Sequence, residues 1–217
     1  MASSVRVSVL ISGRGSNLGS LIKNAKNYIV HAVFSDNPDA TGLLLAKEAG
    51  IRTYAYARED YPNKEKFKDA IMEGVDEVAS DFIALAGFMR VLPEWFVLKN
   101  EGKIINIHPA LLPKFPGLHT HERAIEAHEK EHGCTVHYVD IGVDTGPIIA
   151  QGSCPVMPED DADTLAARVL KIEHQIYPFV LNHIGSGEIA LKGRDVFVSE
   201  TCEEKAKQMG FFLRGEK

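Results

Sequence analysis

Apolar runs alternate with amphipathic segments through the first half of the chain. Apolar runs predict strands at Val5–Ile11, Ile29–Phe34 and Phe82–Ala86, and we expect another strand near Arg52–Ala55. Helices are predicted at Leu18–Ala25, Leu43–Ala49 and about Asn63–Ala79. This alternation is typical of βαβ units, so we predict a Rossmann-like α/β fold with a mostly parallel sheet flanked by helices. Ligands of such sheets bind at the carboxyl ends of the strands.

The second half of the chain contains a further set of predicted elements. We expect strands at Lys103–Ile107, Cys134–Val139 and Ile148–Val156, helices at about Glu122–Lys130 and Ala162–Ile184, and a hairpin of Ile189–Leu191 with Asp195–Ser199. The last residues are polar and are expected to fray. Because no repeat, low-complexity tract or linker interrupts the chain, we predict a single domain over residues 1–217.

Composition and charge narrow the class of protein. The 217 residues are 45% apolar and carry a net charge of −6, which argues against a nucleic-acid partner. The three cysteines include no C-x-x-C pair, so neither a disulfide framework nor a zinc knuckle is indicated. Since the sequence shows no signal-peptide pattern and no apolar run of membrane-spanning length, we expect a cytoplasmic protein with no membrane contact.

A glycine-rich turn, Gly13-Arg14-Gly15-Ser16-Asn17, joins the first strand to the first helix. Glycine lets the backbone approach a ligand closely, and a helix start presents N–H groups to an anion, so the turn is a candidate phosphate site. A tight turn without a ligand is the plainer alternative. Dinucleotide binding is another, because Asp36 follows the second strand, although Leu18 stands where the third glycine of G-x-G-x-x-G would be.

Asn106 and His108 stand two residues apart at the end of a strand, so their side chains share one face. An amide beside an imidazole can stabilise an oxyanion and move a proton. Asp144, in the loop Asp140–Pro147, could orient such an imidazole and raise its pKa. Taken singly, a strand-end histidine is more often structural and an aspartate in a glycine-rich loop more often a turn former.

Other histidines could suggest a metal. His119 and His121 form H-x-H, and His128 and His132 are four residues apart. A zinc site needs three or four converging ligands, and no cysteine pair or H-E-x-x-H motif adds any. We therefore expect no metal.

Four motifs together resemble the formyltransferase family, in particular its phosphoribosylglycinamide formyltransferase (glycinamide ribonucleotide transformylase) branch. In chain order they are Ser12–Asn17, Leu85–Arg90, Asn106–Pro113 and Asp144–Ile149. The resemblance covers about Val5 to Gly187. The N-I-H-P…L-L-P segment and the D-x-G-P loop are shared across the family, whereas the glycine turn, Pro116–His121 and Glu173-His174 are similar to the glycinamide ribonucleotide branch.

The resemblance implies a role for individual residues. The catalytic trio would be Asn106, His108 and Asp144; the nucleotide contacts Gly15, Ser16, Asn17 and Glu173; and the folate contacts Lys64, Met89, Arg90, Val91, Leu92 and Asn106. Lys64 departs from the arginine common at that position, so it lacks a planar fork for an anion. The apolar cluster around Phe88 and Trp95 is either plain core or the folate slot.

The resemblance also implies a reaction. The formyl group of the co-substrate 10-formyltetrahydrofolate would pass to the amine of glycinamide ribonucleotide, in purine (IMP) biosynthesis. The amine would attack directly, Asn106 and a protonated His108 would stabilise the oxyanion, and Asp144 would support that protonation. Residues about 1–100 would form a nucleotide-binding half, about 101–190 a folate-binding and catalytic half, followed by a small C-terminal extension. No permanently bound cofactor is implied, only small-molecule substrates, and the protein would be a monomer or homodimer.

Two other functions stay open on sequence grounds. A nucleotide-dependent oxidoreductase would rest on Gly13, Gly15 and Asp36, and a phosphoribosyl-ligand-binding module would use the same turn without catalysis. Within the family, a tRNA formyltransferase is expected to carry an extra C-terminal domain and a folate hydrolase an extra N-terminal one, and 217 residues have room for neither.

Overall fold

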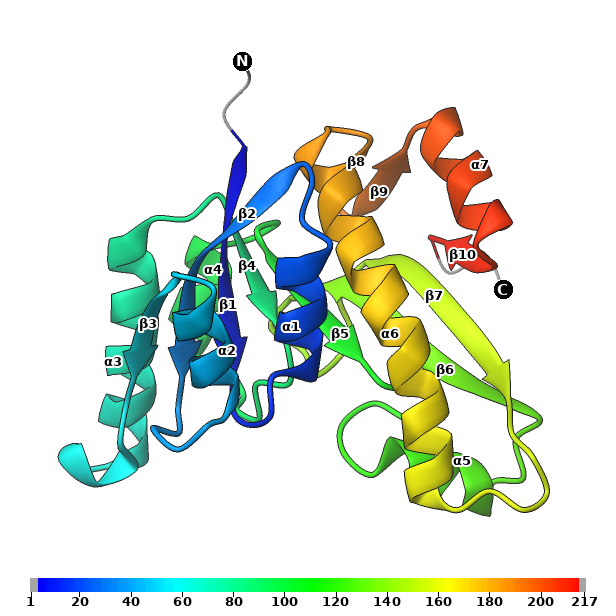
Figure 1. Cartoon of the computed structure of the whole chain (residues 1–217), viewed down its shortest axis with the longest axis horizontal. Coiled ribbons are helices and arrows are strands. Elements are labelled where there is room, and N and C mark those ends of the chain that lie inside the picture. Colours follow the sequence, from blue (N-terminus) through cyan, green and yellow to red (C-terminus); the bar gives the residue numbers. More distant parts are fainter. Residues whose placement is uncertain (1–3, 215–217) are drawn as a thin grey trace. The chain divides into compact units, whose positions relative to one another are not determined.

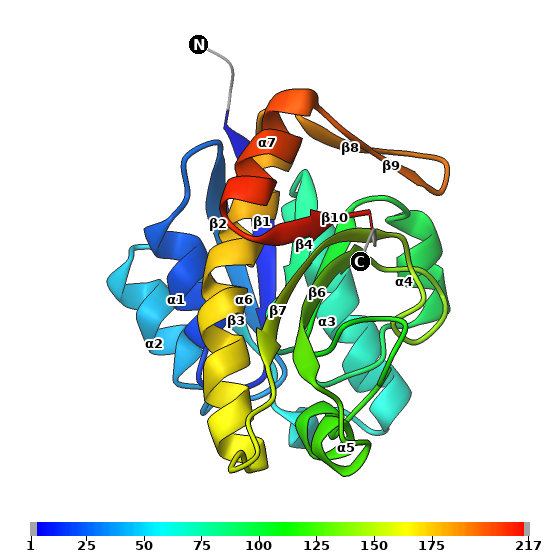
Figure 2. The ribbon, with the colours of Figure 1, turned by 90° about the vertical axis from the view of Figure 1, so that its right-hand side faces the viewer.

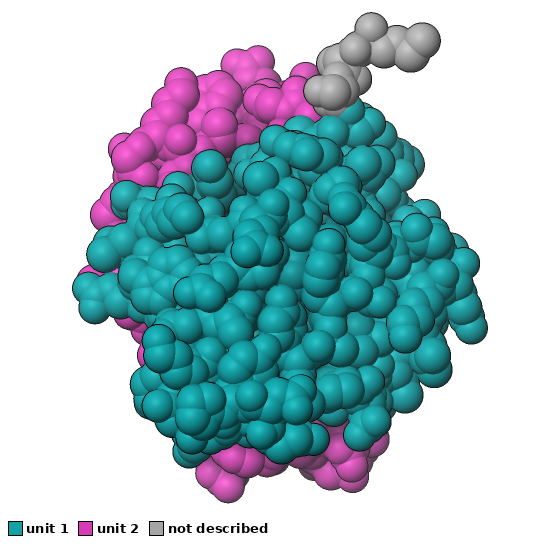
Figure 3. Space-filling model, turned by 90° about the vertical axis from the view of Figure 1, so that its left-hand side faces the viewer, with its two compact units in different colours: residues 1–106 teal, residues 107–217 magenta. Residues whose placement is uncertain are grey.

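A computed structural model describes residues 4–214. By internal contacts the chain forms two compact units, residues 1–106 and 107–217, which are coloured separately in Figure 3. Each unit is described by itself.

The first unit is a parallel α/β unit. Its elements are β1 (Val5–Ile11), α1 (Ser16–Lys23), β2 (Tyr28–Ser35), α2 (Gly42–Glu48), β3 (Arg52–Ala55), a 3-10 turn η1 (Arg58–Asp60), α3 (Lys64–Val78), β4 (Phe82–Leu85), α4 (Glu94–Lys99) and the start of β5 (Ile104–His108). Its strands pair in the order β5-β4-β1-β2-β3, and every pair is parallel. Figure 2 shows α1 and α2 on one face of these strands and α3 and α4 on the other.

Strand order reverses between β1 and β4, and this reversal positions the candidate residues. The chain runs from β1 outward through β2 to β3, then returns to β4 on the other side of β1. Loops that leave neighbouring parallel strands at such a point diverge and leave room for a ligand. The loop after β1 begins at Ser12 and the loop after β4 at Ala86, so the glycine turn and the segment Met89–Leu92 both lie at this edge.

The second unit is built on antiparallel strands. It contains α5 (Thr120–Glu126), β6 (Glu131–Tyr138), β7 (Ile148–Pro155), α6 (Ala162–Gly185), β8 (Ile189–Lys192), β9 (Asp195–Val198), α7 (Glu200–Gln208) and β10 (Phe211–Leu213). β7 pairs with β6 and with β10, while β8 and β9 form a separate hairpin. The long helix α6 packs on β6 and β7 (Figure 1).

Most predicted elements are confirmed within a residue or two. β1 and β3 have the predicted bounds, Asn63 caps α3 by accepting from Lys66 N at 2.8 Å, and Gly50 ends α2 with a φ of 71°. α6 begins, as predicted, at Ala162, after a capping box in which Asp161 Oδ1 accepts from Thr164 N at 2.8 Å.

The expectation that the last residues fray was wrong for those that the structure describes. They form α7 and β10, because Ser199 caps the helix by accepting from Cys202 N at 3.2 Å and Phe211 pairs with Gly152 of β7. Residues 215–217 lie outside the described part. Three other differences concern α4, which we did not predict, α5, which ends at Glu126 rather than near Lys130, and β6, which begins at Glu131 rather than at Cys134. The prediction of a single domain stays a prediction.

Candidate active site

The glycine turn has the backbone geometry that a close ligand approach requires. Gly15 precedes α1 with a φ of 73°, a region that side chains disfavour. A Cβ at Gly15 would lie 2.6 Å from the Cα of Gly42, so the turn is packed against the start of α2. Ser16 is exposed and Asn17 is buried at the start of α1. Leu18, at the position of a third glycine, is fully buried and belongs to the core.

The predicted folate segment, Met89–Leu92, is linked to this turn by Ser12. Ser12 N donates to Gly87 O at 3.1 Å, and Met89 N donates to Ser12 Oγ at 2.9 Å. Met89 and Val91 are 68% and 70% exposed, so the segment presents two apolar side chains to solvent. Isolated exposed apolar residues are common, but two held on a fixed loop suit a flat aromatic ligand.

Asp36 lies directly after β2, where a ribose-binding carboxylate is expected, but its carboxylate already has a partner. It forms an ion pair with Arg90, and its side chain is only 5% exposed. A carboxylate already paired with an internal arginine is a poor acceptor for a ribose hydroxyl. This pairing weakens the dinucleotide alternative further.

Two other predicted contacts lie on helices. Lys64 is exposed at the first position of α3, one turn before the buried Phe67. Glu173 is 7% exposed on α6 in the second unit. Burial raises the pKa of the Cys134 thiol, and the Glu173 charge raises it further.

His108 ends β5 and is 5% exposed, while Asn106, two residues before it on the same strand, is half-buried. The Nε2 of His108 lies 2.9 Å from the carbonyl oxygen of Phe115. A carbonyl oxygen can only accept, so Nε2 carries the hydrogen. Nδ1 faces the Asp144 carboxylate, with 3.3 Å between Nδ1 and Oδ2.

Asp144 stands between two imidazoles. Its Oδ2 accepts from Gly117 N at 2.8 Å, and its Oδ1 lies 3.7 Å from Nε2 of His137. These contacts lower the pKa of Asp144 although burial raises it, so the carboxylate is ionised at neutral pH. The residue has a φ of 55°, a conformation that aspartate tolerates better than most residues. The structure therefore brings Asp144 to His108 as predicted.

The expected direction of the His108 pKa was wrong. Burial lowers this pKa below its ordinary value, and the opposing effects of the Phe115 carbonyl and the Asp144 charge do not fully offset it. We expected Asp144 to raise this pKa above its ordinary value, whereas the net direction is downward. The sequence could place a carboxylate near the ring, but it could not show how deeply the ring is buried.

His137 is a residue that the sequence analysis missed. It is 2% exposed near the end of β6, and its Nδ1 donates to Tyr138 O at 2.8 Å, which directs Nε2 toward Asp144. The available signal was a histidine at the end of an alternating strand, directly before the loop that carries Asp144.

Three other histidines, His119, His121 and His132, have side-chain partners within the second unit. His119 Nδ1 lies 3.5 Å from Glu122 Oε1, and His121 and His132 are joined through ring nitrogens 3.2 Å apart. Among residues 4–214, no three histidine, cysteine, aspartate or glutamate side chains are grouped so that they could hold a metal ion. The same residues include no helix long and apolar enough to cross a membrane.

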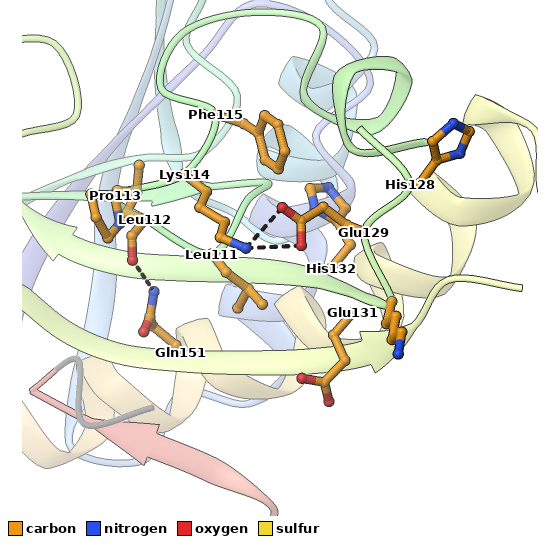
Figure 4. A pocket seen from close by; sticks show the side chains of 11 residues that line it. Leu111, Leu112, Pro113, Lys114, Phe115, His128, Glu129, Glu131, His132 and Gln151 are labelled. Carbon is orange, nitrogen blue, oxygen red and sulfur yellow. Dashed lines mark hydrogen bonds and ion pairs between the residues drawn. The ribbon is translucent and has the colours of Figure 1, made fainter. Parts of the chain in front are cut away.

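A cavity of about 480 Å³ opens in the second unit beside the segment that follows His108 (Figure 4). It is lined by Leu111–Phe115, His128–His132 and Gln151. Lys114 and Glu129 form an ion pair at its wall, with 2.8 Å between Nζ and Oε1. None of the predicted catalytic or binding residues lines it, although Phe115, whose carbonyl oxygen accepts from His108, does.

Comparison with known proteins identifies the class to which these features belong. Residues 5–181 match the Formyl transferase family. The phosphoribosylglycinamide formyltransferase of Escherichia coli (strain K12) is 43% identical over 191 residues, which cover 86% of this chain and 90% of the relative. The solved phosphoribosylglycinamide formyltransferase from Coxiella burnetii is 41% identical with a TM-score of 0.84, over 90% of this chain and 94% of that one.

A longer relative contains a similar region. The trifunctional purine biosynthetic protein adenosine-3 of Drosophila melanogaster is 45% identical over 188 residues, which are 84% of this chain and 14% of the relative. The chain thus spans a small part of that protein and nearly all of the bacterial ones. It belongs to the formyl transferase family, and within that family to the phosphoribosylglycinamide formyltransferase group.

Proposed function

We propose that this protein transfers the formyl group of 10-formyltetrahydrofolate to the amine of glycinamide ribonucleotide, a step of purine (IMP) biosynthesis. The observation that carries the proposal is the buried His108–Asp144 pair in a chain of this family. His108 follows Asn106 by two residues on the same strand. The ionised Asp144, held by Gly117 N, favours a proton on the ring that faces it.

In the proposed reaction the neutral amine attacks the formyl carbon. A new C–N bond forms, and the formyl oxygen becomes an oxyanion that Asn106 and the Nε2–H of His108 stabilise. This Nε2–H donates to the Phe115 carbonyl in the structure, so the oxyanion would replace that acceptor. The bond to folate N10 then breaks, N10 gains a proton and the amine loses one. His108 is suited to carry that proton, because Asp144 stabilises the imidazolium that forms.

The proposed binding residues serve two ligands. Gly15, Ser16 and Asn17 would hold the nucleotide phosphate at the start of α1, and Glu173 would contact the ribose. The folate would lie on Met89–Leu92, with Lys64 near an anionic part and Asn106 near the formyl group. We propose that the enzyme uses no permanently bound cofactor and no metal, since each step uses side chains of this chain. We expect it to bind only small-molecule substrates and to be a cytoplasmic monomer or homodimer.

The decisive experiment follows the folate absorbance on mixing 10-formyltetrahydrofolate with the protein, with and without glycinamide ribonucleotide. We expect conversion to tetrahydrofolate only when the nucleotide is present. Folate conversion without the nucleotide would indicate a hydrolase, and nucleotide binding without conversion would indicate a binding module.

A further inference from the structure

The segment Met89–Leu92 alternates between solvent and interior. Met89 and Val91 are largely exposed, whereas the Arg90 side chain between them is 33% exposed and forms the ion pair with Asp36. The Arg90 side chain, also implied as a folate contact by the family resemblance, therefore leaves the backbone in a different direction from those of Met89 and Val91. What holds Arg90 also fixes the direction of its two neighbours.

Two elements of the first unit hold the Arg90 guanidinium. Asp36 follows β2, and the ring of Phe67 on α3 lies under the guanidinium at 4.8 Å from its carbon to the ring centroid. Arginine is well suited to such a site, because its planar group can stack on an aromatic face and bond a carboxylate at its edge. The loop after β4 is thereby attached to the end of β2 and to α3.

The buried Asp36 carboxylate depends on Arg90 for its counter-charge. The carboxylate is almost fully buried, and within residues 4–214 its Oδ1 has no hydrogen-bond partner. An ionised carboxylate this far from water is stable only with a counter-charge, and Arg90 supplies it. The pair is thus a strong constraint on the loop, unlike an ion pair at the surface.

We propose that Asp36 is a positioning residue for the folate co-substrate. By fixing Arg90 it holds Met89 and Val91 in the direction in which they contact the folate ring. The proposal rests on the proposed function, because it takes Met89–Leu92 as the folate segment. It predicts an effect on folate affinity, with little effect on turnover or on nucleotide affinity.

The test compares Asp36→Asn, Arg90→Gln and the double variant with the unmodified protein. We expect each single variant to raise the KM for 10-formyltetrahydrofolate by about tenfold and to change kcat by no more than about twofold, the size of effect that loss of one well-placed contact gives. Because one pair is broken in all three, the double variant should be no worse than either single. Arg90→Lys keeps the charge and should give a smaller increase.

Direct binding separates this proposal from the proposed function. Trp95, the single tryptophan, follows the segment on α4 and is 40% exposed, so its fluorescence can follow tetrahydrofolate binding without any turnover. Asp36→Asn should weaken that binding, and the control Asp39→Asn, an exposed aspartate in the same loop, should not. Unchanged folate affinity, equal losses for folate and nucleotide, or additive losses in the double variant would overturn the positioning role even in a protein that transfers formyl groups.

Discussion

The Asp144 carboxylate lies 3.3 Å from Nδ1 of His108, in a setting where His108 is 5% exposed and the Asp144 side chain 13%. The pair joins the end of β5 to the loop between β6 and β7. Asp144 therefore acts on a ring that burial would otherwise keep neutral, and this opposition yields two predictions.

The first concerns turnover. Asp144→Asn keeps the shape of the side chain and removes the charge that stabilises imidazolium, so kcat should fall by about a hundredfold or more. Dissociation constants for both substrates should stay nearly the same. His108→Ala should cost a similar amount, and the double variant little more, since the two residues would act as a unit. Losses that add fully in a double-mutant cycle of kcat would argue against the coupling.

The second concerns the protonation of His108. Its pKa should be below 6.5 in the unmodified protein, because burial outweighs Asp144 and the Phe115 carbonyl. Asp144→Asn removes one of the effects that raise it, so the pKa should fall further. NMR titration of the imidazole, with His108→Ala to assign its signals, measures both values. A higher pKa in Asp144→Asn would contradict the assigned electrostatics.

The third concerns the glycine turn. Gly15→Ala places a Cβ 2.6 Å from the Cα of Gly42 on a backbone with a φ of 73°. We expect a loss of about 2 kcal/mol in the free energy of unfolding, and a greater loss of nucleotide affinity than of folate affinity. Gly13→Ala is the control, because a Cβ there meets no atom within 4 Å. Calorimetry with each substrate gives the comparison, and equal losses of affinity would remove the phosphate from this turn.

The fourth concerns stability in acid. Burial, together with the neighbouring His121, lowers the pKa of His132 to about 4. A histidine with a depressed folded-state pKa contributes stability above its unfolded pKa, near 6.5, and that contribution is lost as pH falls toward 4. Between pH 7 and pH 5 this group alone should cost about 2 kcal/mol of unfolding free energy.

Urea unfolding at these two pH values tests the contribution. His132→Asn should unfold more easily at pH 7 but lose about 2 kcal/mol less than the unmodified protein on acidification. The exposed His128→Asn should keep the full pH dependence. An unchanged pH dependence in His132→Asn would show that other groups govern acid stability.

Local pattern was enough to predict most of the first unit. In β1, Val9, Leu10 and Ile11 are fully buried, as a run of consecutive apolar residues in a parallel strand predicts. Gly15 has the positive φ for which a glycine was expected, and Asn63 caps α3. These features depend on residues close together in sequence, whose preferences a short window contains.

The sequence by itself determined the βαβ alternation, the glycine turn after β1 and the placement of His108 at a strand end, because backbone sterics and hydrophobic periodicity act locally. Only the tertiary structure decided that Asp36 pairs with Arg90 and that His137 lies beside the Asp144 carboxylate. It also decided that the residues after β9 form α7 and β10. It also decided the direction of the His108 pKa, since burial depends on what distant segments place around the ring. Long-range contacts and desolvation are set by packing, which local periodicity does not specify.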